Sequence, residues 1–227
     1  MKRIVFAIVL AAATLAMFGC GGGSSPPPTF VTQIVSDQGF DGDITKSPPP
    51  AVFTIVQNAQ SLFAGIHPTT QDESRAFLDF PLTGAGGVPG SAAIVSATLD
   101  LFINSYQSTV STIPMRIELV TFASVLLVAD YDSTPLTTAT VTFPVFRTDS
   151  GQHVAVDVTT LMAEAQRLGL LNFQVRILED FGPVTPGLIE INDTTGPNRG
   201  ALAPLWRLPT PDPVLGPVHP WGSARPC

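Results

Sequence analysis

The chain has few of the residues on which most enzymatic and nucleic-acid-binding sites depend. Its 227 residues include only three His, two Cys, two Trp and two Tyr. Lys and Arg number 11 against 18 Asp and Glu, so the net charge is −7, whereas a surface that binds nucleic acid is basic. There is no Gly-x-Ser-x-Gly, His-Glu-x-x-His, phosphate loop or Cys-x-x-Cys. We therefore expect neither an enzyme nor a nucleic-acid partner.

What the chain has in quantity is apolar residues and turn formers. Apolar residues make up 44% and charged residues 13%, a balance that allows a sizeable core and argues against disorder. The 22 Pro and 19 Gly fall between apolar runs, which indicates many turns. We expect one domain over residues 30–208 and a Pro-rich C-terminal tail over residues 209–227.

The first 28 residues form a pattern typical of export. Lys2 and Arg3 precede an apolar run over residues 4–18, and Cys20 follows Gly19. The run is too short for a comfortable membrane span and fits a signal peptide over residues 1–19. The sequence Leu-Ala-Met-Phe-Gly-Cys at its end resembles a bacterial lipoprotein signal, in which the cysteine becomes the acylated first residue of the mature protein.

The resemblance implies that Cys20 is a lipid anchor and that residues 20–29, rich in Gly, Ser and Pro, are a tether. Several acyl chains on one cysteine would hold the protein stably at a membrane. The expected location is then the outer membrane or the cell surface. The alternative is a plain cleaved signal with an incidental cysteine. Cys227 would be a free or intermolecular thiol in the first case and could pair with Cys20 in the second.

Apolar and polar residues alternate with a period of two over most of residues 30–208. In the segment 75–82, Ala76, Leu78 and Phe80 share one face, while Arg75 and Asp79 lie on the other. Because successive strand residues point to opposite faces, we expect the first set in a core and the second in solvent. The same alternation places Val95, Ala97, Leu99, Leu101 and Ile103 inward. Further strands are expected near residues 52–56, 62–66, 115–119, 140–146, 153–158, 173–177 and 188–191.

One segment, about residues 157–168, has helical periodicity. Leu161, Ala165 and Leu168 share a helical face, and Gly169 is placed to end the helix. Many short strands with a single helix predict an all-β fold, an antiparallel β-sandwich or jelly roll with one short helix.

The order of several strand motifs is similar to that of DNRLRE domains. The motifs are Asp-Gly-Asp-Ile at 41–44, Ser-Arg-Ala-Phe-Leu-Asp-Phe-Pro-Leu at 74–82 and Ile-Val-Ser-Ala-Thr-Leu-Asp-Leu at 94–101. Val-Asp-Val-Thr at 156–159, Gly-Leu-Leu at 169–171, Asn-Arg at 198–199 and Pro-Leu at 204–205 follow in the same order. The resemblance covers about residues 37–208. It implies a β jelly roll of bacterial cell-surface and secreted proteins, some of which are carbohydrate-binding modules.

An acidic cluster near the start of the domain predicts a cation site. Asp37, Asp41 and Asp43 are closely spaced oxygen donors in a loop, and Glu190 or Asp193 could add a further ligand. Such donors suit Ca²⁺, which takes six to eight oxygens. The alternative is an acidic turn with no metal, because Asp-Gly itself favours turns. We therefore expect either a structural calcium ion or no cofactor.

Two loop tyrosines, Tyr106 and Tyr131, are the best candidates for a sugar-binding platform. Three functions remain from the sequence alone. A non-catalytic, lipid-anchored surface domain that contacts envelope or matrix proteins is expected first. A polysaccharide-binding lipoprotein is the alternative, and an enzyme is the least expected.

Overall fold

The computed structural model describes most of the predicted domain, and every described residue belongs to the unit 31–227. The described ranges are 32–83, 87–88, 94–180 and 185–207. The predicted signal peptide, the whole of the predicted tether with Cys20 and the tail 209–227 lie outside these ranges. No helix within them is both long and apolar enough to cross a membrane.

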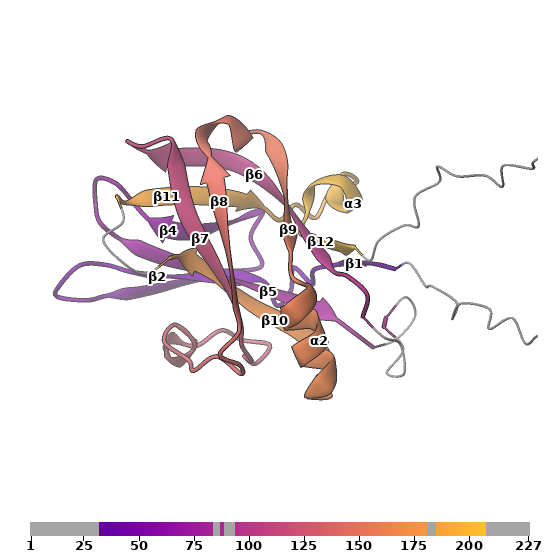
Figure 1. The fold of residues 1–227 in the computed structure, drawn as a ribbon. Coiled ribbons are helices and arrows are strands. Elements are labelled where there is room, and N and C mark those ends of the chain that lie inside the picture. Colours follow the sequence, from indigo (N-terminus) through magenta and orange to yellow (C-terminus); the bar gives the residue numbers. More distant parts are fainter. Residues whose placement is uncertain (1–31, 84–86, 89–93, 181–184, 208–227) are drawn as a thin grey trace, which may run out of the picture. The chain divides into compact units, whose positions relative to one another are not determined.

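The described residues form an antiparallel all-β fold with short helices, as the sequence predicts (Figure 1). The first strands are β1 (Gln33–Val35), β2 (Gly42–Lys46), β3 (Phe53–Gln57), β4 (Ser61–Ile66), β5 (Glu73–Pro81) and β6 (Thr98–Ser108). They are followed by β7 (Thr112–Leu119), β8 (Thr140–Phe146), β9 (Gln152–Asp157), β10 (Asn172–Glu179), β11 (Gly187–Asn192) and β12 (Leu205–Arg207).

The strands form two halves that fold over each other. In the first half β6 pairs with β9, β11 and β12, β11 also pairs with β4, and β1 lies beside β12. In the second half the order is β3, β2, β5, β10, β7 and β8. Among the described residues, sheet pairing between the halves is limited to two residue pairs, between the end of β4 and the start of β5. Because the apolar rows of both halves belong to one core, the arrangement is a jelly-roll-like sandwich.

The core contains most of the side chains that the alternation predicts. Leu78 and Phe80 of β5 are fully buried, as are Leu99 and Leu101 of β6. Val95 is a correction: it is 71% exposed, because β6 begins only at Thr98 and the segment before it is not paired as a strand. The predicted inward row therefore starts at Ala97.

The predicted helix is present as α2 (Thr159–Arg167), between β9 and β10 (Figure 1). Its inward face is formed by Leu161, Met162 and Ala165, which belong to the core. Leu168, predicted on this face, is the residue after the helix and is 39% exposed. A second helix, α3 (Arg199–Leu202), is a single turn that the sequence did not indicate.

The outer face of β5 and β2 is covered by residues 120–139, which we call the cover segment. Phe77 and Ile44 point to this side and form a second core with Phe122, Leu126 and Tyr131 of the cover segment. Two glutamines attach this segment to the sheet. Gln57 donates to the carbonyl of Ser124 at 2.8 Å, and Gln174 donates to that of Phe122 at 3.0 Å. The residues of this sheet face are thus shielded from water.

The cover segment also buries charged residues that we expected in solvent. Arg75 and Arg176 are 8% and 4% exposed, and both donate to the backbone carbonyl of Tyr131. Arg176 Nε donates to Glu118 Oε2 at 3.0 Å, and the Glu118 side chain is also buried. The Arg75 guanidinium lies 3.8 Å from the centre of the Tyr131 ring. The expectation that Arg75 and Asp79 face solvent is therefore wrong.

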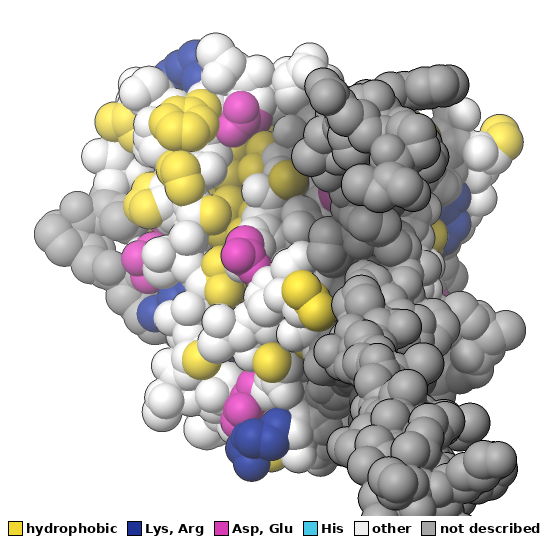
Figure 2. Space-filling model, turned by 45° about the vertical axis from the view of Figure 1, so that its right-hand side comes forward, with side chains coloured by type: hydrophobic (Ala, Val, Ile, Leu, Met, Phe, Trp, Pro, Cys, Tyr) yellow, Lys and Arg dark blue, Asp and Glu magenta, His cyan; other side chains and the backbone are white. Residues whose placement is uncertain are grey.

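One face of the molecule has few charges among its described residues. Figure 2 shows hydrophobic side chains between mostly uncharged ones on the face that it displays, with acidic and basic side chains sparse. This agrees with the composition and with exposed large apolar residues such as Val110, Phe146 and Leu171.

Candidate functional site

Two buried carboxyl groups that are far apart in the sequence lie close to each other near the residue that follows β1. Asp41 lies directly before β2, and Asp193 directly after β11. Both are 0% exposed, and Asp193 lies close enough to Asp41 to add to the effect of burial in raising the pKa of the Asp41 carboxyl. The segment after β1 and the segment after β11 therefore converge on a single buried acidic pair.

Asp41 is fixed by the backbone around it. Its Oδ1 accepts the amide hydrogen of Asp79 at 2.7 Å, and its own amide donates to the carbonyl of Asp37 at 2.9 Å. The next residue, Gly42, must be a glycine in this packing, because a Cβ there would lie 2.6 Å from both Leu126 Cδ1 and a backbone oxygen of β3. The Asp-Gly-Asp motif thus places a carboxylate at the sheet margin.

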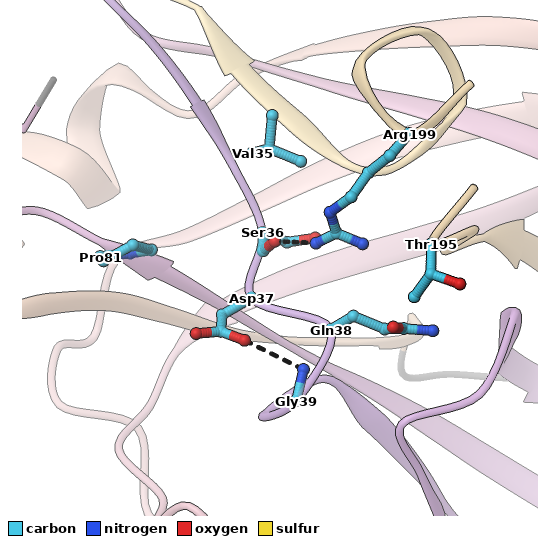
Figure 3. A pocket seen from close by; sticks show the side chains of 8 residues that line it. All are labelled: Val35, Ser36, Asp37, Gln38, Gly39, Pro81, Thr195 and Arg199. Atoms are coloured by element: carbon cyan, nitrogen blue, oxygen red, sulfur yellow. Dashed lines mark hydrogen bonds between the residues drawn. The ribbon is translucent and has the colours of Figure 1, made fainter. Parts of the chain in front are cut away.

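Asp193 is held by Arg199, the first residue of α3. Arg199 Nη1 lies 3.5 Å from Asp193 Oδ1 and donates to the carbonyl of Thr194 at 3.2 Å. Its other terminal nitrogen donates to the carbonyl of Ser36, so this side chain links α3 to the residue after β1 (Figure 3).

We call the place where Ser36, Asp41 and Asp193 lie together the junction. Three oxygens there have no hydrogen-bond partner. They are Oδ2 of Asp41, Oδ2 of Asp193 and Oγ of Ser36, and all three are buried. The Ser36 hydroxyl is near enough to both carboxyl groups to lower their pKa, although it forms no hydrogen bond of ordinary geometry with either. Burial outweighs this effect and raises the pKa of Asp193 to about 7 and that of Asp41 well above its usual range.

The predicted calcium ligands are only partly brought together. Asp41 and Asp193 meet, and Asp37 lies near them but is exposed and accepts the amide hydrogen of Gly39 at 3.0 Å (Figure 3). Within the described residues no group of three or more His, Cys, Asp or Glu side chains is arranged to hold a metal.

The other two predicted ligands have structural partners elsewhere. Asp43 Oδ2 accepts the amide hydrogen of Phe63 at 3.2 Å, and burial raises the pKa of Asp43 to about 6. Glu190 accepts from the side chains of Asn104 at 3.3 Å and Ser105 at 2.9 Å. The Asp43 contact joins β2 to β4, and the Glu190 contacts lie between the paired strands β11 and β6, so neither residue belongs to the junction.

Sequence reasoning missed Asp79 as part of this region. Asp79 is 1% exposed, and its carboxylate accepts from the side chains of Asn172 at 2.8 Å and Gln174 at 2.8 Å. Burial is the main cause that raises its pKa. The signal was present in the amides at alternate positions of β10, but only the pairing of β5 with β10 shows which residues they face.

A shallow hollow of about 420 Å³ opens beside the junction. Figure 3 shows Arg199, Gln38 and Thr195 on one side of it and Pro81 on the other, with Ser36 between them. Solvent can therefore approach the segment after β1 from this side.

The two predicted sugar-binding tyrosines differ in exposure. Tyr131 is 1% exposed and packs against Arg75 and edge-on against Phe53, with 5.2 Å between the ring centres. This contradicts the expectation of an exposed platform at Tyr131. Tyr106 is half-buried, donates to the carbonyl of Val110 at 2.8 Å and has Arg147 at 5.5 Å from its ring centre.

A separate buried carboxyl group, Glu179, lies where β4, β10 and β11 meet. Its Oε2 accepts amide hydrogens from Ile66 at 3.1 Å and Gly187 at 3.3 Å, while Oε1 has no partner. Burial raises the pKa of Glu179 to about 7, against an ordinary value of 4.5. The folded state therefore binds this proton more tightly than the unfolded state.

This shift gives a pH dependence with a defined sign. The contribution of Glu179 to stability is complete below pH 4.5 and is lost as the pH rises through about 7. Glu179→Gln should lose this part of the slope of the free energy of unfolding against pH. At pH 8 we expect it to be more stable than wild type by about 1–3 kcal/mol. Urea denaturation between pH 4 and 8 measures it. Glu164→Gln, on the exposed side of α2, is the control and should keep the wild-type slope, and an unchanged slope in Glu179→Gln would contradict the assignment.

Comparison of the chain with known families and proteins gives no assignment: no family model and no curated protein matches it.

Proposed function

We propose that the chain is a non-catalytic, lipid-anchored domain of the bacterial cell envelope, with a structural or protein-interaction role. The observation that carries the proposal is the position of Cys20 between a signal-like apolar run and a Gly/Ser/Pro tract, ahead of a folded all-β unit. The resemblance to DNRLRE domains of surface proteins agrees with this reading.

The uses of the buried acidic groups support a non-catalytic role. Asp41, Asp43 and Glu179 each accept backbone amide hydrogens from a neighbouring strand or segment. Asp79 is held by two side-chain amides, and Glu118 by an arginine. A pair of catalytic carboxylates must instead face a common cleft that admits substrate. In this domain these groups join strands and loops.

The anchor is tested by metabolic labelling with an alkyne fatty acid. Wild-type protein should incorporate the label and remain with the membrane fraction, because acyl chains on Cys20 would insert in the bilayer. Cys20→Ser should lose essentially all of the label. Cys227→Ser is the matched control, since it removes the other cysteine and should label as wild type does. Equal labelling of Cys20→Ser and wild type would refute the anchor.

Sugar binding, the alternative from the sequence, now depends on Tyr106, because Tyr131 is buried. A glycan array with the purified protein separates the two proposals. Binding to no glycan agrees with a structural role, whereas specific binding that Tyr106→Ala abolishes would replace it with a polysaccharide-binding function.

A further inference from the structure

We propose that the chain self-associates through β3, which pairs with the β3 strand of a second copy in a symmetric antiparallel dimer. Within the described residues β3 (Phe53–Gln57) pairs with β2 alone, so it forms one margin of its half of the sandwich. The open backbone groups of a strand at a sheet margin can bind a further strand. The proposal goes beyond the anchoring role and does not depend on it, because association through β3 is measured in solution.

The backbone groups that β3 presents at this margin follow from its bonds to β2. The amide of Ser47 donates to the carbonyl of Val52 at 3.0 Å, one step beyond the paired residues. Because bonded residues alternate along an antiparallel pair, the even-numbered residues of β3 use their backbone groups on β2. Phe53, Ile55 and Gln57 therefore direct their N–H and C=O groups away from β2.

These three residues are arranged symmetrically about Ile55. When two β3 strands pair antiparallel with their centres aligned, Ile55 lies opposite Ile55 of the second copy and Phe53 lies opposite Gln57. Every outward backbone group then meets an outward backbone group. A surface that matches itself in this way is what a two-fold dimer requires, which is why a second copy is the occupant that we infer.

The β3 margin lacks the features that prevent sheets from pairing edge to edge, namely charged side chains and proline. No Asp, Glu, Lys or Arg occurs in residues 47–71, and β3 itself contains no proline. The margin at the other end of this half, β8, is different. The amide of Arg147 donates to the carbonyl of Ser111 at 2.9 Å, so the even-numbered residues of β8 direct their backbone groups away from β7. One of them is Pro144, which has no N–H and interrupts the outward row.

Exposed apolar side chains lie on both sides of the β3 margin. Val52 and Val56, which are 62% and 41% exposed, lie on one face of the sheet. On the other face the cover segment carries Val125 and Leu127, which are 62% and 55% exposed. Gln57 holds the residue between these two, because its Oε1 accepts that residue's amide hydrogen at 3.2 Å. Pairing of two copies would remove part of this apolar surface from water.

The paired margin is short, so we expect a weak dimer. A contact formed by one five-residue strand from each copy falls at the small, transient end of protein interfaces. We expect a Kd of about 10 µM, with which the protein is mostly dimeric at about 100 µM and mostly monomeric at about 1 µM.

The experiment measures the protein mass of the full chain in excess detergent, by light scattering coupled to absorbance and refractive index. A reducing agent removes any disulfide-linked dimer. Wild type should be dimeric at about 100 µM, whereas Thr54→Lys/Val56→Lys should be monomeric. In the dimer position 54 of one copy faces position 56 of the other, in a pair whose side chains are close, so lysine would face lysine. Both positions are exposed, so the fold should be unaffected.

Two further variants separate strand pairing from other effects of charge. Thr140→Lys/Thr142→Lys is the matched control, since it places two lysines at exposed positions of β8 and should leave the dimer intact. Thr54→Glu/Val56→Glu should be monomeric alone, and an equimolar mixture with Thr54→Lys/Val56→Lys should restore the dimer mass, because opposite charges then face each other. A monomeric wild type at about 100 µM would overturn the proposal. So would a dimer that persists in Thr54→Lys/Val56→Lys, or a mixture that stays monomeric.

Discussion

Replacing Arg176 with alanine is expected to lower the free energy of unfolding by about 3–5 kcal/mol. The guanidinium is 4% exposed and is bound to Glu118 and to the carbonyl of Tyr131. Its removal leaves the Glu118 carboxylate buried with Arg116 as the remaining cationic neighbour, at 3.0 Å, and frees the cover segment from one of its attachments. Urea denaturation followed by fluorescence or circular dichroism measures the change.

Arg167→Ala is the matched control for this experiment. Arg167 also forms an ion pair, with Glu164 at 2.6 Å, but its side chain is 66% exposed and the pair lies on the surface of α2. Exposed ion pairs contribute little, because water and salt screen them. A similar loss of stability in Arg176→Ala and Arg167→Ala would show that the cover segment does not exclude water from the outer face of β5 and β10.

Phe80→Ala should lower the free energy of unfolding by about 3–5 kcal/mol, through lost transfer energy and the cavity that remains. Phe80 is 0% exposed, and its ring centre lies 6.1 Å from that of Phe173 on the paired strand. Thermal or urea denaturation again gives the value. The m-value should stay the same if only the core is affected.

The control here tests the boundary of β6. Val95→Ala should change stability by no more than about 0.5 kcal/mol, as at other surface positions, because Val95 is 71% exposed. Alternation along the sequence instead puts Val95 in the core. A loss at Val95 as large as that at Phe80 would mean that β6 begins earlier and that the sequence pattern was right.

The sequence predicts the inner faces of the strands well and the outer face of β5 poorly. The inward positions of Leu78, Phe80 and Leu99 follow from a period of two, which is a local property of the chain. The burial of Arg75 and Asp79 depends on distant residues, namely the cover segment and β10. Nothing in the local pattern distinguishes a polar residue that faces water from one that faces another polar side chain.

The junction was predictable to a similar extent. Closely spaced aspartates and a partner near the end of the domain were visible in the sequence, and Asp41 and Asp193 do meet. Their neighbours Asp43 and Glu190 have equivalent chemistry, but the arrangement of the strands places them against Phe63 and Asn104 instead. The alignment of neighbouring strands decides which carboxylates share a site. That alignment depends on the whole fold and not on the local sequence.

The pairing of the first strand with the last also decides where the chain enters and leaves the sandwich. Gln33 of β1 lies opposite Arg207 of β12, so the path into the folded unit and the path out of it start from neighbouring points. Any domain or label fused directly after β12 would therefore emerge beside the start of β1. A reporter intended to project away from this edge would need to be inserted in a turn at some distance from it, such as the one at Gly151 between β8 and β9.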